Sequence, residues 1–387
     1  MTRLKYPWFS LLMLGVILLF AQRITYADAA ITKVCPSTGI QARATDFKPG
    51  GIILTSFDKS AIWVYNIDNG RRYPLPDTAP CTSNCHLSPD STWLTFFNDP
   101  TNTFNIMHLD GTQRALVVEN AAEVEWWNPT TYLVWTPAKQ AYLVPTAGGD
   151  KEYLNVDGVI SVQPGGRFGL EVKPKDDFFE RWLINLQLRG IDGVSDQAVD
   201  LGADKAYFDA QSWSPDGKWL GYVAPVPIAA GSKQVSGEIF GIKPGDTQPT
   251  QWTQLTSIYG AERINGVAVG ELSWSPDSSK IAFWVTPITG ANFTANLGSS
   301  VIHILDVNTG ALTSYCGFAT NDQTPNPSRL VWSPDGTTLA FAGALPNDKN
   351  GYYLLAMDVA SGAITSLTQG VFPVFGVPDV VAWGNHE

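Results

Sequence analysis

Four cysteines and four histidines carry the most specific chemistry in this sequence, and one of the cysteines lies directly before a histidine. Cys81 and Cys85 are four residues apart, and His86 follows directly. An even number of cysteines in an oxidising compartment normally forms disulfides. We therefore expect a Cys81–Cys85 bridge, which leaves Cys35 and Cys316 as the second pair.

Two other chemistries of the 81–86 segment stay open. Cys-x-x-Cys-His attaches c-type haem, but this segment has one more residue between its cysteines. Zinc would need a fourth ligand besides Cys81, Cys85 and His86, and no candidate is adjacent in the sequence. The prediction is a disulfide, with no cofactor and no metal site.

Familiar catalytic motifs are missing from the sequence. It contains no His-Glu-x-x-His, no phosphate-binding loop, no dinucleotide fingerprint and no Gly-x-Ser-x-Gly. His108 and His303 fall in predicted strands, where a structural role is expected. We assign no catalytic residue, and the sequence favours a binding protein over an enzyme without deciding between them.

The composition is that of a globular chain with an acidic surface. Of 387 residues, 44% are hydrophobic and 16% are charged, and the formal net charge is -11. Such a charge repels phosphate backbones, so we expect no nucleic-acid partner.

The first 29 residues have the pattern of a secretory signal peptide. Arg3 and Lys5 precede a short apolar run over 8–21, and Ala27-Asp28-Ala29 forms a small-x-small cleavage site. We expect residues 1–29 to be removed and 30–387 to form one periplasmic or extracellular domain. After cleavage we expect no stable membrane insertion; an uncleaved segment would instead anchor the protein.

Seven segments repeat one pattern, a short apolar strand followed by a Ser-Pro-Asp-Gly-like turn and an alternating strand. Three copies agree closely: QSWSPDGKWLGYV (211–223), LSWSPDSSKIAFW (272–284) and LVWSPDGTTLAFA (330–342). The other four copies are more degenerate: HLSPDSTWLTFF (86–97), DFKPGGIILTSF (46–57), WWNPTTYLVWT (126–136) and SVQPGGRFGLEV (161–172). Their prolines align at positions 49, 89, 129, 164, 215, 276 and 334.

Each repeat predicts a four-stranded antiparallel unit. Ser-Pro-Asp-Gly fits a type I turn, and later turns such as Asn308-Thr309-Gly310 suit hairpins. No window has the 3.6-residue periodicity of a capped helix. One such unit cannot bury both faces, so we expect an all-β propeller with seven four-stranded blades, six and eight staying open. The closing inner strand is either 380–384 or 40–47.

The repeat resembles that of the TolB propeller family, which also occurs in propellers of prolyl-oligopeptidase-like enzymes and oligogalacturonate lyases. The resemblance covers residues 40–387 and implies the fold. Trp213, Trp274 and Trp332 occupy its tryptophan position, which implies packing between blades. The shared residues are turn and core residues, so the resemblance implies no particular activity.

Loop lengths predict which face of the propeller binds a ligand. The tight turns lie on one face, and five long connections lie on the other: 224–237, 257–270, 286–299, 316–328 and 343–350. Loops of this kind often form binding surfaces. Within them we select Tyr259, Arg263, Phe293 and Asp322 as the candidate binding face. The expected function is an exported, monomeric binding or scaffold propeller that recognises a protein or a glycan; the alternative is a carbohydrate-active lyase or hydrolase.

Overall fold

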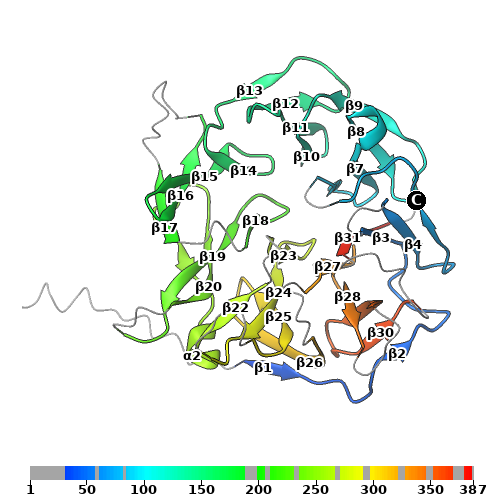
Figure 1. The fold of residues 1–387 in the computed structure, drawn as a ribbon, viewed down its shortest axis with the longest axis vertical. Helices are drawn as coiled ribbons and strands as arrows, with labels where there is room; N and C mark the ends of the chain where they lie inside the picture. Colours follow the sequence, from blue (N-terminus) through cyan, green and yellow to red (C-terminus); the bar gives the residue numbers. More distant parts are fainter. Residues whose placement is uncertain are drawn as a thin grey trace, which may run out of the picture. The chain divides into compact units, whose positions relative to one another are not determined.

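The structure, a computed structural model, is a seven-bladed β-propeller (Figure 1). The residues that it describes are 31–56, 61–81, 84–187, 198–204, 210–230, 235–265, 271–290, 297–320, 327–345, 352–368 and 379–385. Within these ranges, no helix combines the length and the apolar character needed to cross a membrane.

Each blade is an antiparallel sheet of four strands, to which some blades add further strands. We number the blades by the order of their second strands. Blade 1 contains β31 (Asp379–Gly384), β3 (Ile52–Ser56), β4 (Trp63–Asn66) and β5 (Arg72–Pro74). Blade 2 contains β6 (His86–Leu87), β7 (Trp93–Asn98), β8 (Thr103–His108) and β9 (Ala115–Glu119), with a 3-10 turn at Asp99–Thr101. Blade 3 contains β10 (Glu123–Asn128), β11 (Thr131–Trp135), β12 (Ala141–Pro145) and β13 (Glu152–Leu154). Blade 4 contains β14 (Val159–Val162), β15 (Phe168–Lys175), β16 (Phe178–Asn185) and β17 (Val199–Asp204).

The last three blades are more elaborate. Blade 5 contains β18 (Gln211–Trp213), β19 (Leu220–Pro227), β20 (Val235–Ile242) and β21 (Thr250–Gln251), followed by the short helix α2 (Leu255–Tyr259). Blade 6 contains β22 (Glu262–Ile264), β23 (Ser273–Trp274), β24 (Lys280–Pro287), β25 (Ser300–Asp306) and β26 (Leu312–Thr320). Blade 7 contains β27 (Val331–Trp332), β28 (Thr338–Ala344), β29 (Tyr352–Asp358) and β30 (Ile364–Ser366). β1 (Thr32–Val34) and β2 (Gln41–Ala42) join the outer strands β26 and β30.

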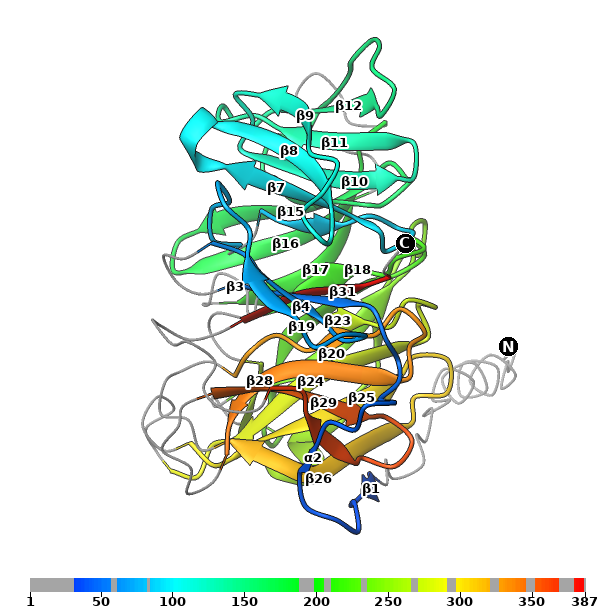
Figure 2. The same ribbon diagram turned by 90° about the vertical axis from the view of Figure 1, so that its right-hand side faces the viewer.

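The ring is closed by the C-terminal strand. β31 pairs antiparallel with β3 and takes the inner position of blade 1 (Figure 2). The 40–47 segment does not compete for this position, because β2 lies on the outer edge of blade 7. The closing strand that the sequence left open is therefore 380–384.

The Ser-Pro-Asp-Gly turns owe their shape to a repeated set of hydrogen bonds. In blade 7, the Ser333 hydroxyl donates to Asp335 (2.7 Å) and accepts from the Thr338 backbone N–H (3.0 Å). The turn residue after the aspartate has positive φ, as at Gly217 (67°) and Gly336 (69°). Glycine adopts this conformation at least cost, which explains its place in the repeat.

The repeat tryptophans pack between neighbouring blades, as the resemblance implied. Trp274 Nε1 donates to the carbonyl oxygen of Ser212 in blade 5 (3.2 Å), and Trp332 Nε1 donates to that of Ser273 in blade 6 (2.9 Å). The Ser212 hydroxyl in turn donates to the Leu272 carbonyl oxygen (2.6 Å). These reciprocal bonds fix one inner strand beside the next.

Several connections are shorter than we predicted, because regular structure extends into them. β19 continues to Pro227 and β26 continues to Thr320. The 257–270 connection contains the end of α2 and all of β22, which extends the inner edge of blade 6.

Candidate functional site

A channel lies along the axis of the propeller, between the inner strands. It encloses about 720 Å³ and is lined by turn prolines such as Pro89 and Pro276 and by inner-strand tryptophans such as Trp126 and Trp332. A second, polar recess of about 260 Å³ lies at the end of the channel where the inner strands begin, away from the tight turns. We call it the mouth recess; its lining includes His86, Glu125, Trp126, Glu271, Arg329 and Val381.

The mouth recess and the channel share part of their walls. Trp126, Glu271, Arg329 and Val381 line both spaces. Since the inner strands run from the recess toward the tight turns, the recess lies on the face of the long connections. A ligand that reaches the channel from this face first meets the charged side chains of the recess.

Two ion pairs are built into the recess. His86 Nε2 lies 2.8 Å from Glu123 Oε1 and joins the inner strands of blades 2 and 3. Arg329 Nε lies 2.7 Å from Asp379 Oδ2, and the Arg329 backbone N–H donates to Asp379 Oδ1 (2.9 Å). The second pair joins blade 7 to the closing strand β31, so it belongs to the seam of the ring.

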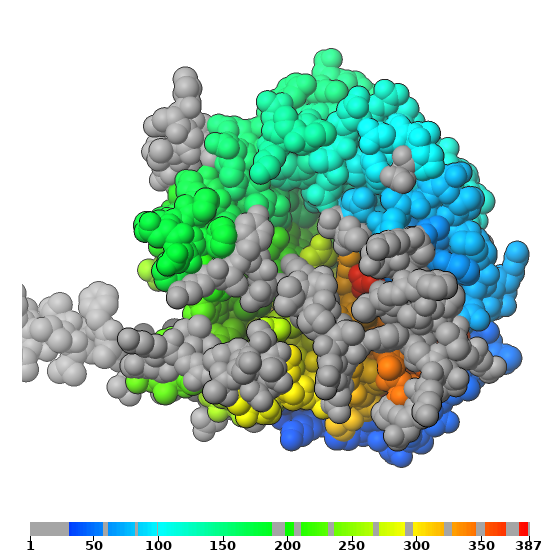
Figure 3. All heavy atoms as spheres, viewed as in Figure 1, coloured from blue at the N-terminus to red at the C-terminus, as the bar shows by residue number. Residues whose placement is uncertain are grey.

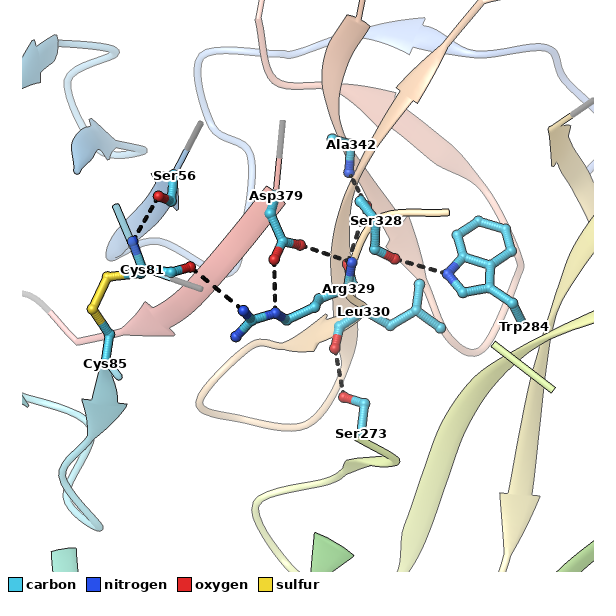
Figure 4. A network of polar contacts seen from close by, with 10 residues as sticks. All are labelled: Ser56, Cys81, Cys85, Ser273, Trp284, Ser328, Arg329, Leu330, Ala342 and Asp379. Carbon is cyan, nitrogen blue, oxygen red and sulfur yellow. Dashed lines mark hydrogen bonds and ion pairs between the residues drawn. A yellow bond between two sulfur atoms is a disulfide. The ribbon is translucent and has the colours of Figure 1, made fainter. Parts of the chain in front are cut away.

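Arg329 is also the centre of a wider network (Figure 4). Its Nη2 group donates to the Cys81 carbonyl oxygen at 3.5 Å, and the Cys81 N–H donates to the Ser56 hydroxyl (2.9 Å). The preceding residue, Ser328, accepts from Trp284 Nε1 through its carbonyl oxygen (2.9 Å). Blades 6, 7, 1 and the entry to blade 2 are thus tied together at one point.

Burial and neighbouring charges shift the pKa values of two groups in the recess, His86 and Glu125. Burial acts to lower the pKa of His86, but the hydrogen bond with Glu123 and the charges of Glu125 and Glu271 outweigh it and raise the pKa to about 9. Burial is the main cause that raises the pKa of Glu125 to about 7; the His86 charge opposes it and the Glu123 charge adds to it. His86 is therefore a cation at neutral pH, and Glu125 titrates near neutrality.

The two ion pairs leave an excess of negative charge. Glu125 accepts a hydrogen bond from Trp135 Nε1 (2.6 Å), which is a neutral donor. In the described part of the chain, no side chain pairs with the exposed carboxylate of Glu271. Two carboxylates in a polar recess, each without a cationic partner of its own, are suited to a ligand that carries positive charge.

Two of the four residues predicted for the binding face are described, and neither lines the recess. The Tyr259 hydroxyl lies 2.8 Å from His303 Nε2, and the ring packs on the core between blades 5 and 6. Arg263 lies in β22, half-buried, on the side of blade 6 from which the inner strand starts. Phe293 and Asp322 lie outside the described residues. This binding face stays a prediction.

Both expected disulfides are present in the structure. Cys35 is joined to Cys316, and Cys81 is joined to Cys85. Cys85 also lines the mouth recess beside His86, so the shorter bridge shapes the site rather than a distant surface.

Sequence reasoning did not select the charged residues of the recess, although a signal existed. When the repeats are aligned on the turn proline, charged residues stand three to six positions before it: His86, Glu123, Glu125, Glu271 and Arg329. Read singly, each is an ordinary strand or loop residue. Only their shared position at the start of an inner strand indicates that they meet at the axis.

Comparisons with known proteins support the fold. Neither a scan against protein-family models nor a search of curated proteins gives a match. Among solved structures, an oligogalacturonate lyase from Vibrio parahaemolyticus is 11% identical, with 84% of this chain and 86% of that chain covered and a TM-score of 0.50. TolB from Acinetobacter baumannii is 17% identical, with coverages of 86% and 82% and a TM-score of 0.41. The propeller domain of the Trilobed protease from Pyrococcus furiosus is 13% identical, with coverages of 73% and 82% and a TM-score of 0.42. At such identities, the likeness to the lyase extends to the β-propeller fold and not to its activity.

Proposed function

We propose that this chain is an exported binding propeller that recognises a protein ligand at the mouth recess, through a lysine or arginine side chain of the ligand. The observation that carries the proposal is the excess of two carboxylates, Glu125 and Glu271, in a recess whose other charges are paired. A cation placed there would gain from both carboxylates, in a site partly shielded from water. The signal peptide-like segment and the two disulfides support export.

The test distinguishes binding at the recess from general attraction to the acidic surface. Tetralysine peptide serves as a probe, and its affinity is measured by calorimetry for the natural protein and for Glu125→Gln and Glu271→Gln. We expect each variant to bind roughly tenfold more weakly, and Glu119→Gln on an outer strand to leave binding unchanged. Equal weakening by all three variants would mean that only the overall charge attracts the probe.

The physiological ligand is then sought with the same variants. Proteins retained from an envelope extract by the natural chain are compared with those retained by the Glu125→Gln, Glu271→Gln double variant, and mass spectrometry identifies the difference. A partner that depends on the recess is lost with the double variant and kept with Glu119→Gln. A ligand set that is identical for all of the variants contradicts the proposed site.

A second candidate function is that of a carbohydrate-active lyase or hydrolase. The observation in its favour is the convergence of titratable groups with shifted pKa values at the axis, where Glu125 could donate a proton and Glu271 could accept one. Release of reducing ends from a polysaccharide panel tests it. In this case Glu125→Gln abolishes turnover while substrate binding persists.

A further inference from the structure

The N-terminal residues 31–43, which we call the strap, lie on the outer rim of blades 6 and 7. β1 runs parallel to β26, with Thr32 opposite Thr313 and Val34 opposite Tyr315. β2 runs parallel to β30, with Gln41 opposite Thr365. Figure 3 shows the blue N-terminal segment beside the yellow and orange parts of the chain. All other strand pairs in the named sheets are antiparallel, so the strap is an addition to blades that are already complete.

The rim is shaped to receive this segment. Val34 and Ile40 pack against the core cluster of blades 6 and 7. A Cβ atom at Gly317 would lie 2.9 Å from Pro36 Cγ, and one at Gly362 would lie 3.0 Å from Val34 Cγ1. An added side chain at either position would crowd the strap, so two glycines of the rim leave room for two side chains of the strap.

One disulfide fixes the strap, and it is accessible. Cys35 and Cys316 are both exposed. Besides this bond and the packing of Val34 and Ile40, the strap strands have five opposed residue pairs with the rim, three at β26 and two at β30, and the Arg43 N–H donates to the Ser366 carbonyl oxygen. Ring closure does not depend on the strap, because β31 and the Arg329–Asp379 pair close the ring near the axis.

We propose that the outer rim of blades 6 and 7 is a strand-acceptor surface, that the Cys35–Cys316 disulfide locks the chain's own strap onto it, and that after reduction the rim accepts the strap of a second copy. A dithiol supplies the two electrons and is itself oxidised to a disulfide, while Cys35 and Cys316 each take up a proton. The second copy is the partner that fits, since its strap carries the same apolar residues and the same cysteine. Exchange of identical elements is a low-cost route to a dimer.

The first test measures docking on the rim through Cys316. The full-length Cys35→Ser variant, in which Val34→Asp and Ile40→Asp also keep its own strap off the rim, has a single free thiol there. Its partner is a synthetic peptide of residues 31–43 whose Cys35 is activated as a mixed disulfide with thionitrobenzoate. The Cys316 thiolate attacks the peptide sulfur and releases thionitrobenzoate, whose absorbance gives the rate.

A scrambled peptide with its cysteine in the same position is the control for simple thiol reactivity. We expect the natural sequence to react at least tenfold faster than the scrambled one. In the same variant with Gly317→Val, which fills the place of Pro36, the natural peptide should slow to the scrambled rate. Equal rates for the two peptides on the variant that keeps Gly317 would show that the rim does not recognise the strap, and would overturn the proposal.

The second test asks whether a second copy supplies the strand. Equal amounts of ¹⁴N- and ¹⁵N-labelled natural protein are reduced under native conditions, mixed at high concentration and reoxidised. We expect disulfide-linked peptides that join Cys35 of one label to Cys316 of the other, in a species of dimer mass. Exclusively same-label links in a monomer would refute exchange between copies.

Discussion

At the scale of single residues, the fold depends on a turn that is repeated with small variations. In four blades a serine and an aspartate bond to each other and to the following backbone: Ser88–Asp90, Ser214–Asp216, Ser275–Asp277 and Ser333–Asp335. Burial acts to raise the pKa of Asp335, but hydrogen bonds from Ser333 and Thr337 outweigh it and hold the pKa below its usual range. These aspartates therefore favour the folded state in their ionised form.

We expect Asp335→Ala to lower the free energy of unfolding by about 1 kcal/mol at pH 7, because it removes the bonds from Ser333 and Thr337. A folded pKa below the unfolded pKa stabilises the protein above the unfolded value, and this stability is lost as the pH falls through the folded pKa. The difference from the natural protein should thus vanish in strong acid. Denaturant unfolding at several pH values measures it, and an unchanged difference at pH 2.5 would contradict the assignment.

Two glycines at the same turn position should respond differently to alanine. Both have positive φ, so each substitution costs about 1 kcal/mol of strain. A Cβ at Gly217 would lie 2.3 Å from the Pro164 carbonyl oxygen, whereas at Gly336 the nearest atom is Pro276 Cδ at 3.8 Å. We expect Gly217→Ala to cost at least about 1–2 kcal/mol more than Gly336→Ala. Thermal unfolding of the two variants measures this difference in stability. Equal losses would show that blades 4 and 5 move apart at little cost to make room for the added Cβ.

At the scale of elements, the seam between blades 7 and 1 is the place where the ring is held by strands from opposite ends of the chain. β31 brings Asp379 to Arg329, and Trp383 Nε1 donates to the Gly50 carbonyl oxygen (3.0 Å). Tyr65 of blade 1 donates to the Leu367 carbonyl oxygen beside blade 7 (2.6 Å). Single substitutions in these contacts should therefore change the stability of the seam more than that of the other blades.

We expect Asp379→Ala to destabilise the seam by about 2 kcal/mol, since it leaves a largely buried guanidinium without its carboxylate. Hydrogen exchange should increase in β31 and β3 and stay unchanged in β15 and β16, on another side of the ring. The double variant Arg329→Met, Asp379→Ala should recover part of the loss, because the buried cation that has lost its carboxylate is gone. Uniform loss of protection in every blade would show that the seam does not open separately.

At the scale of the whole molecule, the propeller concentrates charge at one end of its axis. Five blades contribute to the lining of the mouth recess, yet no two of its charged residues in different blades are closer than 37 residues in the sequence. An excess of carboxylates there, within a chain of net charge -11, would attract cationic ligands along the axis.

Binding of tetralysine should strengthen as the pH rises from 6 to 8. Glu125, with a pKa of about 7, becomes ionised over this range, while His86, with a pKa of about 9, keeps its proton. Calorimetry at constant ionic strength should show several-fold tighter binding at pH 8, and Glu125→Gln should flatten the profile. A profile that Glu125→Gln leaves unaltered would assign the pH dependence to another group.

Export predicts a defined N-terminus for the mature protein. We expect the chain recovered from its native host to lack residues 1–29, because Ala27-Asp28-Ala29 forms the cleavage site. Intact-mass measurement shows this directly. A mature chain that keeps residues 1–29 would indicate a membrane anchor instead.

The sequence by itself determined the repeat, the all-β class and the turns, and it favoured seven blades while six and eight stayed open. The reason is that these depend on local signals: a proline that fixes φ, a glycine that tolerates positive φ, and alternation of apolar residues. The pairing of Cys81 with Cys85 was also predictable, since four residues separate the two cysteines.

Only the tertiary structure decided which strand closes the ring and where the charges meet. The segments 380–384 and 40–47 are both plausible strands, and only packing places the first inside blade 1 and the second outside blade 7. The mouth recess could not be derived, because Glu125, Glu271 and Arg329 come from three blades and their proximity depends on closure of the ring. Loop length led to the prediction of a binding face but could not select its residues, since a long loop does not specify which side chains reach the axis.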